Sequence, residues 1–505
     1  MGEVTPEGRS PLCERLLSVA LSAPTSALCE TVGGGSIQLS QLLREAELLA
    51  RDLTSRGLAG ERVLIMLDPG IEWARAFLAT LLAGAVAVPL PLSAPAVELA
   101  YLASDSRPRA SFASDSYRER LPRGLEVLAT TPRGGDSAVC TLPAATCPAL
   151  ILYTSGTTGR PKGALITHQN LFSQTSALCE AWGLSRSDVL LHALPLHHLH
   201  GVVVAFLSAL TAGASIRMLA KFDADVVLRE LDAATVFMAV PTMIQRILDR
   251  ADALASDEQA RCSAAAGALR LVTSGSAALP LRLSERWRKL AGAIPLERYG
   301  MTEIGIALSN SLDVRGRKPG FVGSPLATVE IRIVGDDGVD GDGPGELLVG
   351  GPSVFAGYFD RPDATRESFR DGWFITGDVA IRDAAGNVRL LGRKSADILK
   401  TGGEKVSALE IEEVLREYEP FAEVAVVGVP DAEWGDRVVA CVVARAGAEA
   451  AAATAPMRAW AKQQLAPYKV PREVLLLPEL PKNAMGKVQK GVLVAMLGKR
   501  DAASD

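Results

Sequence analysis

The sequence Leu152-Tyr-Thr-Ser-Gly-Thr-Thr-Gly-Arg-Pro-Lys-Gly163 follows an apolar lead, residues 149–152, that is typical of the end of a buried strand. Glycines let a backbone approach a ligand closely and turn several N–H groups toward it. The hydroxyl side chains add further donors, and Lys162 adds a positive charge. These groups predict a loop that holds phosphate oxygens. The predicted phosphate-binding residues are Thr154, Ser155, Gly156, Thr157, Thr158, Gly159 and Lys162.

Two features separate this loop from better-known patterns. It is not the usual P-loop, because Lys162 is followed by Gly163 and the glycine spacing does not match. A flexible surface turn rich in Gly, Ser and Thr is the alternative interpretation. A turn seldom needs this many donors beside one lysine, so we favour the phosphate loop.

The chain on both sides of the loop predicts a large α/β domain. Amphipathic helices alternate with short buried strands, which is typical of parallel sheets flanked by helices. Helices are predicted over 40–56, 70–83, 95–104, 171–182 and 202–212, and strands over 62–67, 86–92, 189–193, 215–218, 236–239 and 269–273. A chain of 505 residues is too long for one compact core, so two or more domains are expected.

The pattern changes after residue 320 to short strands separated by Gly/Asp turns, which predicts a small β-barrel-like subdomain over about 320–392. The aspartates in its turns, such as Asp340 and Asp342, match no EF-hand spacing, so turn formation is favoured over calcium binding. The last segment is predicted to be α+β, with helices over 408–417 and 457–465.

Composition excludes several classes of protein. Hydrophobic residues make up 48% and charged residues 22% of the chain, as in ordinary globular proteins, and the net charge of −5 gives no basic field for nucleic acid. Seven cysteines without paired spacing favour reduced thiols.

Acidic residues within 1–25 disfavour a secretory signal and a transit peptide. The apolar run over 77–92 is interrupted by glycine and predicts a helix followed by a strand, not a membrane span. We therefore expect a cytoplasmic protein, with the mitochondrial matrix as the alternative.

All five histidines lie between residues 168 and 200, and three of them fall in Leu194-Pro-Leu-His-His-Leu-His-Gly201. A metal site is one interpretation of His197, His198 and His200. However, adjacent histidines in an extended segment point to opposite faces, and no cysteine or acid nearby completes a ligand set. We therefore favour the lining of a substrate pocket.

Four further motifs carry polar or charged groups. They are Leu271-Val-Thr-Ser-Gly-Ser-Ala-Ala-Leu-Pro280, Leu296-Glu-Arg-Tyr-Gly-Met-Thr-Glu303, Gly372-Trp-Phe-Ile-Thr-Gly-Asp378 with Gly392-Arg393, and Pro481-Lys-Asn-Ala-Met-Gly-Lys487. Small residues in the first allow a flat ring to lie on the backbone. Each motif alone has an alternative interpretation without a functional role, such as a core tyrosine or a surface lysine.

Together and in this order, from about residue 38 to 492, the motifs resemble those of the adenylate-forming enzymes, which include acyl-CoA synthetases, peptide-synthetase adenylation domains and luciferases. The resemblance implies that Gly275, Ser276 and Ala277 form the adenine turn. It also implies that Tyr299 offers adenine an aromatic face. Thr302 would bind the α-phosphate, and Glu303 would bind Mg²⁺ together with substrate phosphates.

The resemblance also assigns roles near the C-terminus. Asp378 would accept hydrogen bonds from the ribose, and Arg393 would meet the ribose or a phosphate. The domains implied are 1–393, a hinge at 394–397 and a mobile domain at 398–505, although the hinge spacing departs by about one residue from the commoner pattern. Gly402 and Gly403 would line the pantetheine channel. Lys487 would reach the carboxylate and the α-phosphate during adenylation.

The acid substrate is predicted from polar residues in the expected pocket, namely His198, His200, Arg298 and Ser274. Arg298 can form paired hydrogen bonds with a second carboxylate. The alternative is a structural pair with Glu297. These motifs resemble those of the malonyl-CoA synthetases within the family, and the expected cofactor and co-substrates are Mg²⁺, ATP and CoA.

Three other functions remain open from the sequence. They are a ligase for a medium-chain or aromatic monocarboxylate, an adenylating enzyme that loads a carrier protein, and a non-catalytic nucleotide or acyl-CoA sensor. The intact Lys162, Glu303, Asp378, Arg393 and Lys487 argue against the sensor.

Overall fold

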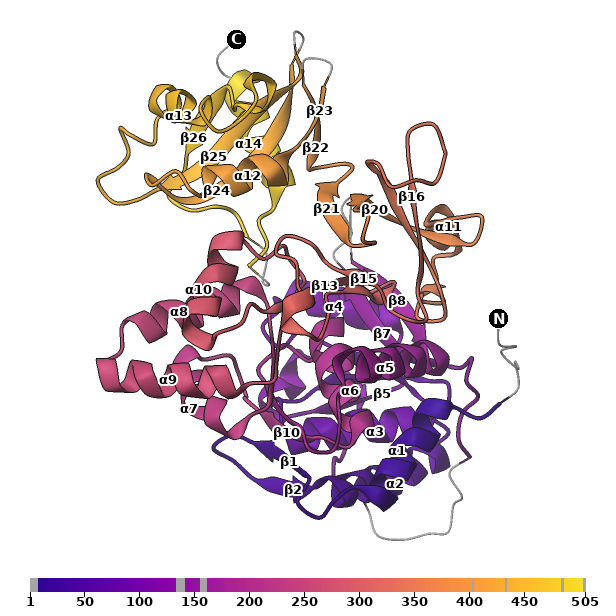
Figure 1. Ribbon diagram of the computed structural model, residues 1–505. Coiled ribbons are helices and arrows are strands. Elements are labelled where there is room, and N and C mark those ends of the chain that lie inside the picture. The colour runs from indigo at the N-terminus through magenta and orange to yellow at the C-terminus, as the bar shows by residue number, and fades with distance from the viewer. Residues whose placement is uncertain are drawn as a thin grey trace. The chain divides into compact units, whose positions relative to one another are not determined.

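The computed structural model describes residues 8–132, 141–154, 161–401, 404–431, 434–482 and 486–502 (Figure 1). The chain forms two compact units. Unit 1 comprises residues 1–319, 323–330 and 349–374, and unit 2 comprises 320–322, 331–348 and 375–505. Each unit is described by itself below.

Unit 1 contains a seven-stranded sheet in the order β18-β8-β7-β4-β3-β5-β6. Its strands are β3 (Arg62–Met66), β4 (Val86–Pro89), β5 (Ala110–Ala113), β6 (Glu126–Leu128), β7 (Pro148–Thr154), β8 (Lys162–Thr167) and β18 (Gly357–Tyr358). Strands β7, β4, β3, β5 and β6 pair in parallel, whereas β8 is antiparallel to both β7 and β18. The predicted parallel sheet is therefore present, with an antiparallel edge beside the predicted phosphate loop.

A second sheet of unit 1 has nine strands in the order β15-β14-β13-β12-β11-β9-β10-β1-β2. They are β1 (Leu28–Thr31), β2 (Ser36–Gln38), β9 (Val189–His192), β10 (Ser215–Met218), β11 (Val236–Ala239), β12 (Leu271–Ser274), β13 (Leu296–Met301), β14 (Gly305–Ser309) and β15 (Ser324–Pro325). From β13 to β1 all pairs are parallel, and β2, β14 and β15 are antiparallel.

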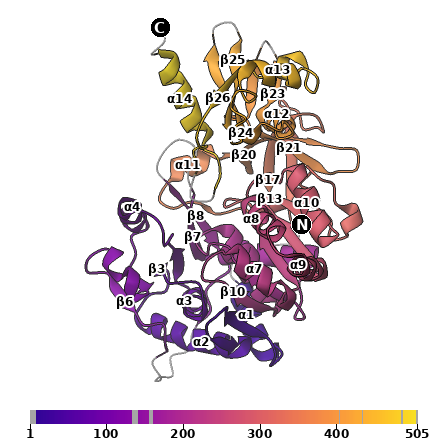
Figure 2. The same ribbon diagram turned by 90° about the vertical axis from the view of Figure 1, so that its left-hand side faces the viewer.

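The helices of unit 1 are α1 (Pro11–Ser22), α2 (Leu39–Ser55), α3 (Ile71–Leu82), α4 (Ala96–Ser106), α5 (His168–Trp182), α6 (Ser208–Ala212), α7 (Ala224–Glu230), α8 (Pro241–Asp252), α9 (Ser256–Ala268), α10 (Leu281–Ala291) and α11 (Pro362–Glu367). Helix α3 contacts β3 and β4 of one sheet and β1 of the other, and α5 contacts β8 and β14. Both helices therefore lie between the two sheets. Helices α7, α8, α9 and α10 form a separate group (Figures 1 and 2).

Burial explains why α3 takes this central position. Every residue from Trp73 to Leu82 is buried, as expected for a helix that is mostly apolar, and the one charged residue among them, Arg75, pairs with Glu45. The apolar run over 77–92 is the end of α3 followed by β4, which agrees with the prediction. Among the residues that the structure describes, no helix has both the length and the apolar character to span a membrane.

The predicted β-rich segment forms a five-stranded sheet of β16 (Glu330–Val334), β17 (Gly345–Gly350), β19 (Phe369–Arg370), β20 (Trp373–Arg382) and β21 (Val388–Arg393). The boundaries between the two compact units fall within β17 and β20. The domain boundary at residue 393 and the hinge at 394–397 stay predictions.

The C-terminal part of unit 2 is a five-stranded sheet with helices on both faces. Its strands are β22 (Ile398–Thr401), β23 (Glu404–Ser407), β24 (Phe421–Asp431), β25 (Gly435–Ala444) and β26 (Glu473–Leu476), and its helices are α12 (Ala408–Leu415), α13 (Thr454–Ala461) and α14 (Lys490–Ala502).

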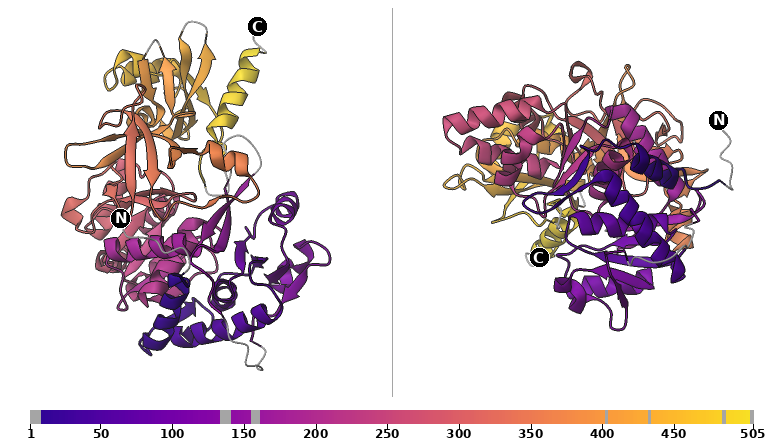
Figure 3. Two further views of the ribbon diagram at one scale, coloured as in Figure 1. Left: turned by 90° about the vertical axis from the view of Figure 1, so that its right-hand side faces the viewer. Right: turned by 90° about the horizontal axis from the view of Figure 1, so that it is seen from below.

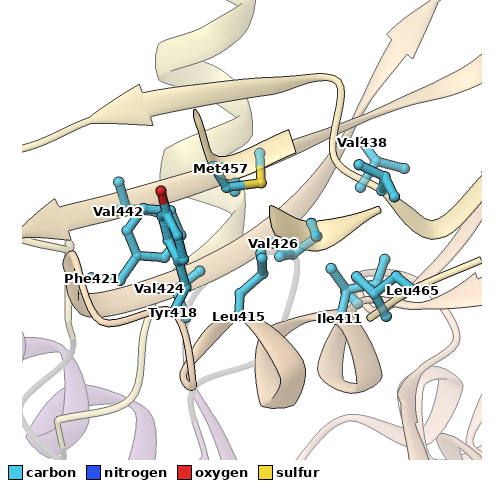
Figure 4. Packing of buried hydrophobic residues seen from close by; sticks show 14 of the residues in the cluster. Ile411, Leu415, Tyr418, Phe421, Val424, Val426, Val438, Val442, Met457 and Leu465 are labelled. Atoms are coloured by element: carbon cyan, nitrogen blue, oxygen red, sulfur yellow. The ribbon is translucent and has the colours of Figure 1, made fainter. Parts of the chain in front are cut away.

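Alternating side chains of β24 supply two separate cores. Val424 and Val426 pack with Ile411 and Leu415 of α12 (Figure 4). Val427 instead joins the cluster that includes residues of α14, which lies beside the sheet as the yellow helix of Figure 3. The alternation follows from the two-residue period of a strand. The α+β character predicted for this segment is confirmed.

Candidate functional site

Strands β7 and β8 bring the two ends of the predicted phosphate loop together. Thr154 pairs with Lys162 across the hairpin, and its Oγ1 lies 3.5 Å from the Lys162 carbonyl oxygen. The Tyr101 hydroxyl donates to the Pro161 carbonyl at 2.8 Å. The loop residues between them, Ser155, Gly156, Thr157, Thr158 and Gly159, lie outside the described residues.

The Tyr299–Glu303 motif lies on a tight hairpin between β13 and β14. A Cβ atom on Gly300 would lie 2.1 Å from the Gly305 carbonyl oxygen, so only glycine fits this close backbone approach. Thr302 and Glu303 fall in the turn, and the Glu303 side chain is buried. The turn therefore fixes the Glu303 backbone while its carboxylate points toward a neighbouring strand.

That neighbouring strand is β18, whose tyrosine links two of the predicted site residues. The Tyr358 hydroxyl donates to Glu303 Oε1 at 3.0 Å. The Lys162 Nζ lies over the Tyr358 ring, 5.0 Å from its centroid. The structure thus brings Lys162 and Glu303 into contact with one tyrosine, the lysine at its ring face and the glutamate at its hydroxyl.

The donor set at Glu303 fits magnesium. Mg²⁺ prefers oxygen ligands and is usually held by one or two carboxylates plus substrate phosphates. Glu303 supplies a buried carboxylate, and Thr302 next to it supplies a hydroxyl. Over the described ranges, no group of three or more His, Cys, Asp or Glu side chains could hold a metal ion. Such an ion would therefore depend on a bound nucleotide.

The predicted adenine turn directly follows β12. Ser274 is fully buried at the end of this strand, whereas Ser276 and Ala277 are exposed. Ser276 has a φ of 68°, a left-handed conformation that non-glycine residues adopt at some cost. Tyr299, on β13, is 8% exposed. Strands β12 and β13 are neighbours, so the turn and the tyrosine lie at the same edge of the sheet.

Arg298 lies on β13 and is 4% exposed. Its guanidinium packs on Gly275, where an added Cβ would lie 2.3 Å from Arg298 Cζ. In the described part of the chain, neither Nε nor Nη2 of Arg298 has a hydrogen-bond partner. Burial lowers its pKa from 12.5 to about 9. Arg298 is therefore a buried cation with unused hydrogen-bond donors. A pair with Glu297, the alternative predicted from the sequence, does not satisfy these donors.

His200 and Ser274 add two further groups without hydrogen-bond partners among the described residues. Both ring nitrogens of His200 and the Ser274 Oγ are in this state. Burial, followed by the positive charge of Arg298, lowers the His200 pKa well below its usual value. His200 is therefore neutral, and the charge of this pocket comes from Arg298.

The conformation around His197 and His198 corrects one sequence interpretation. The segment is a turn, not an extended strand, and the two rings lie together with centroids 4.1 Å apart. Burial, and then His198, lower the pKa of His197 to about 3, and burial lowers that of His198 to about 4. The predicted helix over 202–212 also begins earlier, with a π-helix from His200 to Leu207, a form that often marks functional sites.

The other two histidines are part of the core. His168 Nδ1 lies 3.1 Å from the Ser10 hydroxyl, and His192 Nε2 lies 3.0 Å from the Gly201 carbonyl oxygen. Both are fully buried. Sequence clustering of all five histidines did not distinguish these two from the pocket residues.

The predicted ribose residues lie in unit 2. Asp378 and Arg393 pair across β20 and β21, with Arg393 Nε 3.1 Å from Asp378 Oδ1. The Arg393 backbone N–H donates to Asp397 Oδ2 at 2.9 Å. Lys487 is exposed in the same unit. Gly402 and Gly403 lie outside the described residues.

Sequence reasoning missed an ionic cluster in unit 2. Lys490 at the start of α14 places its Nζ 2.5 Å from Asp397 Oδ1 and 2.6 Å from Glu412 Oε1. Glu412 Oε1 also accepts from the Val426 N–H at 2.8 Å. Lys490 gives no signal in the sequence, because its acidic partners lie far from it in the chain. Tyr358 was missed too, since a Gly-Tyr pair after an apolar run gives no signal by itself.

Comparison with known proteins supports the assignment of the fold and the family. Residues 22–359 match the model of the AMP-binding enzyme family, and residues 410–487 match that of the AMP-binding enzyme C-terminal domain. The mouse protein malonate–CoA ligase ACSF3, mitochondrial, is 42% identical over 86% of this chain and 82% of its own.

Solved structures agree with these matches. The crystal structure of ATP-bound MatB from Rhodopseudomonas palustris has a TM-score of 0.87 and 36% identity, covering 97% of this chain and 99% of that one. A malonyl-CoA ligase in a ternary product complex with methylmalonyl-CoA and AMP has a TM-score of 0.66 and 39% identity, covering 92% of this chain and 99% of that one. The predicted fold class, the predicted family and the prediction of an AMP-forming acid–CoA ligase are confirmed. The chain belongs to the AMP-binding enzyme family.

Proposed function

We propose that this protein is a malonyl-CoA synthetase, which converts malonate, ATP and CoA to malonyl-CoA, AMP and pyrophosphate, and that it also accepts methylmalonate. The observation that carries the choice of acid is Arg298, a buried guanidinium with two nitrogens that lack hydrogen-bond partners among the described residues. The malonate–CoA ligase activity named for the mouse relative supports the same choice.

The argument for a second carboxylate is energetic. An unpaired buried charge is costly, so buried arginines are normally paired. A carboxylate of the substrate would offset this cost and can accept two parallel hydrogen bonds from one guanidinium. His200 and Ser274 offer uncharged groups beside it. A fatty or aromatic monocarboxylate would leave Arg298 uncompensated.

Adenylation activates the other carboxylate. A carboxylate resists thiol attack because its carbonyl is electron-rich and its oxygen leaves poorly, whereas AMP is a good leaving group. Lys162 and the loop residues 154–159 would hold the phosphates of ATP, and Thr302 would bind the α-phosphate. Glu303 would hold Mg²⁺, which neutralises phosphate charge. Lys487 would stabilise the negative charge that develops as the mixed anhydride forms.

The remaining site residues orient the nucleotide and the acid. The turn of Gly275, Ser276 and Ala277 and the ring of Tyr299 would bind adenine, and His198 would line the acid pocket. Asp378 and Arg393 would bind the ribose or a phosphate. Rotation about residues 394–397 would then withdraw Lys487 and present the Gly402-Gly403 channel, so that the CoA thiol attacks the adenylate and AMP leaves. We propose a cytoplasmic or mitochondrial-matrix location.

The test is AMP release with ATP, Mg²⁺ and CoA for malonate, methylmalonate, acetate, octanoate and benzoate, in wild type and in Arg298→Ala. Wild type is expected to prefer malonate. The variant is expected to lose about 2–5 kcal/mol of malonate recognition, roughly a 30- to 5,000-fold fall in kcat/KM, because one partner of a buried charge pair is removed. Activity with acetate is expected to fall far less.

Arg315→Ala serves as the control, because it removes one arginine whose side chain is 92% exposed and bonded to Asp313. It should behave as wild type with every acid. A preference for octanoate or benzoate that Arg298→Ala leaves unchanged would overturn the dicarboxylate proposal while leaving the adenylation chemistry in place. Acid-dependent ATP–pyrophosphate exchange distinguishes an enzyme from a nucleotide sensor, and the dependence of AMP release on CoA excludes a carrier-protein acceptor.

A further inference from the structure

We propose that Tyr358 is a positioning residue of the nucleotide site, which keeps Lys162 and Glu303 apart so that both charges are available to ATP and its metal ion. The inference rests on the proposed roles of Lys162 and Glu303. It goes beyond them, since it assigns a function to a side chain that would itself contact neither the acid nor CoA.

The geometry gives the tyrosine two contacts of opposite kind. Its ring face lies 5.0 Å from the Lys162 Nζ, within the range of a cation–π interaction. Its hydroxyl donates to Glu303 Oε1 at 3.0 Å. Within the described residues, neither Lys162 nor Glu303 has an ion-pair partner. The tyrosine therefore contacts both charged groups, in a part of the structure where no direct Lys162–Glu303 salt bridge is present among the described residues.

The position of the ring is fixed by its own strand. Tyr358 pairs with Ala164 of β8, the strand that leaves the phosphate loop. Its backbone N–H donates to Thr365 Oγ1 at 2.8 Å, and its ring makes an edge contact with Phe355, with centroids 4.9 Å apart. The backbone N–H of Phe355 in turn donates to the Glu303 carbonyl at 2.8 Å. One short segment therefore holds both the tyrosine and the carboxylate backbone.

The consequence concerns the protein before ATP binds. If Lys162 and Glu303 paired directly, an incoming phosphate and its metal ion would have to break that pair. A neutral tyrosine that contacts both groups leaves the ammonium with its N–H donors and the carboxylate with its second oxygen. The tyrosine thus preorganises the site by preventing a competing interaction.

The experiment compares Tyr358→Leu, which removes both contacts, with Tyr358→Phe, which keeps the ring and removes the hydroxyl. ATP affinity is measured by equilibrium dialysis without metal, and Mn²⁺ binding to the protein–ATP complex by electron paramagnetic resonance. Tyr358→Leu is expected to weaken metal-free ATP binding about tenfold, because a charged competitor now pairs with Lys162. Tyr358→Phe is expected to keep ATP affinity and to weaken Mn²⁺ binding about threefold to tenfold, because the Glu303 carboxylate loses its orienting hydrogen bond.

The decisive variant is the double substitution Tyr358→Leu with Glu303→Gln. Removing the carboxylate abolishes the competing salt bridge, so metal-free ATP affinity should return to that of Glu303→Gln alone. A tyrosine with only a packing role would give a loss that the second substitution does not rescue, and that result would overturn the inference. So would wild-type ATP affinity in Tyr358→Leu.

Tyr117→Phe is the matched control, since its hydroxyl donates to the Asp68 carboxylate at 2.9 Å elsewhere in unit 1. It should change neither ATP nor Mn²⁺ binding, and a change there would show that the loss of any tyrosine hydroxyl is enough. Failure of the inference is separable from failure of the proposed function. Wild-type protein that uses malonate but shows no rescue overturns only the role of Tyr358, whereas wild type that does not bind ATP overturns both.

Discussion

Two cationic side chains with little exposure to solvent, Lys490 and Arg298, differ in whether the protein supplies partners for their charge. Lys490 in unit 2, with a side chain 14% exposed, lies between two carboxylates at 2.5 and 2.6 Å. Arg298 in unit 1 is 4% exposed, and two of its nitrogens have no hydrogen-bond partner in the described structure. A saturated buried charge needs nothing further from solution. An unsaturated one marks a position where a ligand can supply the missing anion.

The pKa shifts express the same contrast. Burial opposes the positive charge at both sites. The carboxylates of Glu412 and Asp397 nevertheless raise the pKa of Lys490, whereas burial lowers that of Arg298 to about 9. Desolvation is common to the two residues, so the presence or absence of an acidic partner decides the direction.

The largest effect is expected from Lys490→Met. The substitution removes Lys490 from the buried carboxylate of Asp397 and leaves Glu412 with Arg416 alone, which costs about 3–5 kcal/mol of unfolding free energy. Urea unfolding should therefore show the transition of unit 2 at a lower denaturant concentration. Lys499→Met, an exposed position of the same helix, is the control. Equal stability of the Lys490 variant and wild type would show that this ionic cluster does not stabilise unit 2. The contrast drawn between Lys490 and Arg298 would then be wrong.

Arg298→Met should act in the other direction on stability. A methionine fills similar space without a charge to desolvate, so unfolding free energy is expected to rise by about 1–3 kcal/mol while malonate use is lost. Saturating malonate should raise the unfolding temperature of wild type and not of the variant. A variant less stable than wild type would mean that Arg298 is held by partners inside the protein.

The smallest effect is a pH dependence. Arg298 must be protonated to bind a carboxylate, and its pKa is about 9 in the folded protein, below the 12.5 of the unfolded chain. The ratio of malonate to acetate kcat/KM is therefore expected to be constant between pH 6 and about 8 and to fall about tenfold per unit well above pH 9. The ratio cancels the titration of groups that both acids share.

His197, His198 and His200 lie in one segment of the chain. Burial lowers the pKa of each, so all three are neutral between pH 6 and 8. These histidines should therefore cause no change in the malonate-to-acetate ratio of kcat/KM between pH 6 and 8. A step in the ratio near pH 6.5 would instead assign the recognition of the second carboxylate to a histidine.

The sequence predicted the order of elements, the family and the loop ends well, because strand alternation and spaced glycines are local signals. It also singled out Arg298 through its place before Tyr299. It did not predict that the rings of His197 and His198 lie against each other in a turn, because the sequence does not show whether two adjacent histidines lie in a strand or in a turn. Tyr358 and Lys490 were missed for another reason: their partners lie far away in the chain, and only the tertiary structure brings them together.

The pairing of β18 with β8 has a consequence for the folding of the chain during its synthesis. Ala164 is synthesised long before its partner Tyr358. Until residues 357–358 leave the ribosome, β8 is an unpaired sheet edge beside the predicted phosphate loop, and such edges can pair with other chains. Contacts of this sequence separation also form slowly. Nascent chains truncated before β18 should therefore aggregate more readily than chains that include it, and the ATP site should mature only after that strand has docked.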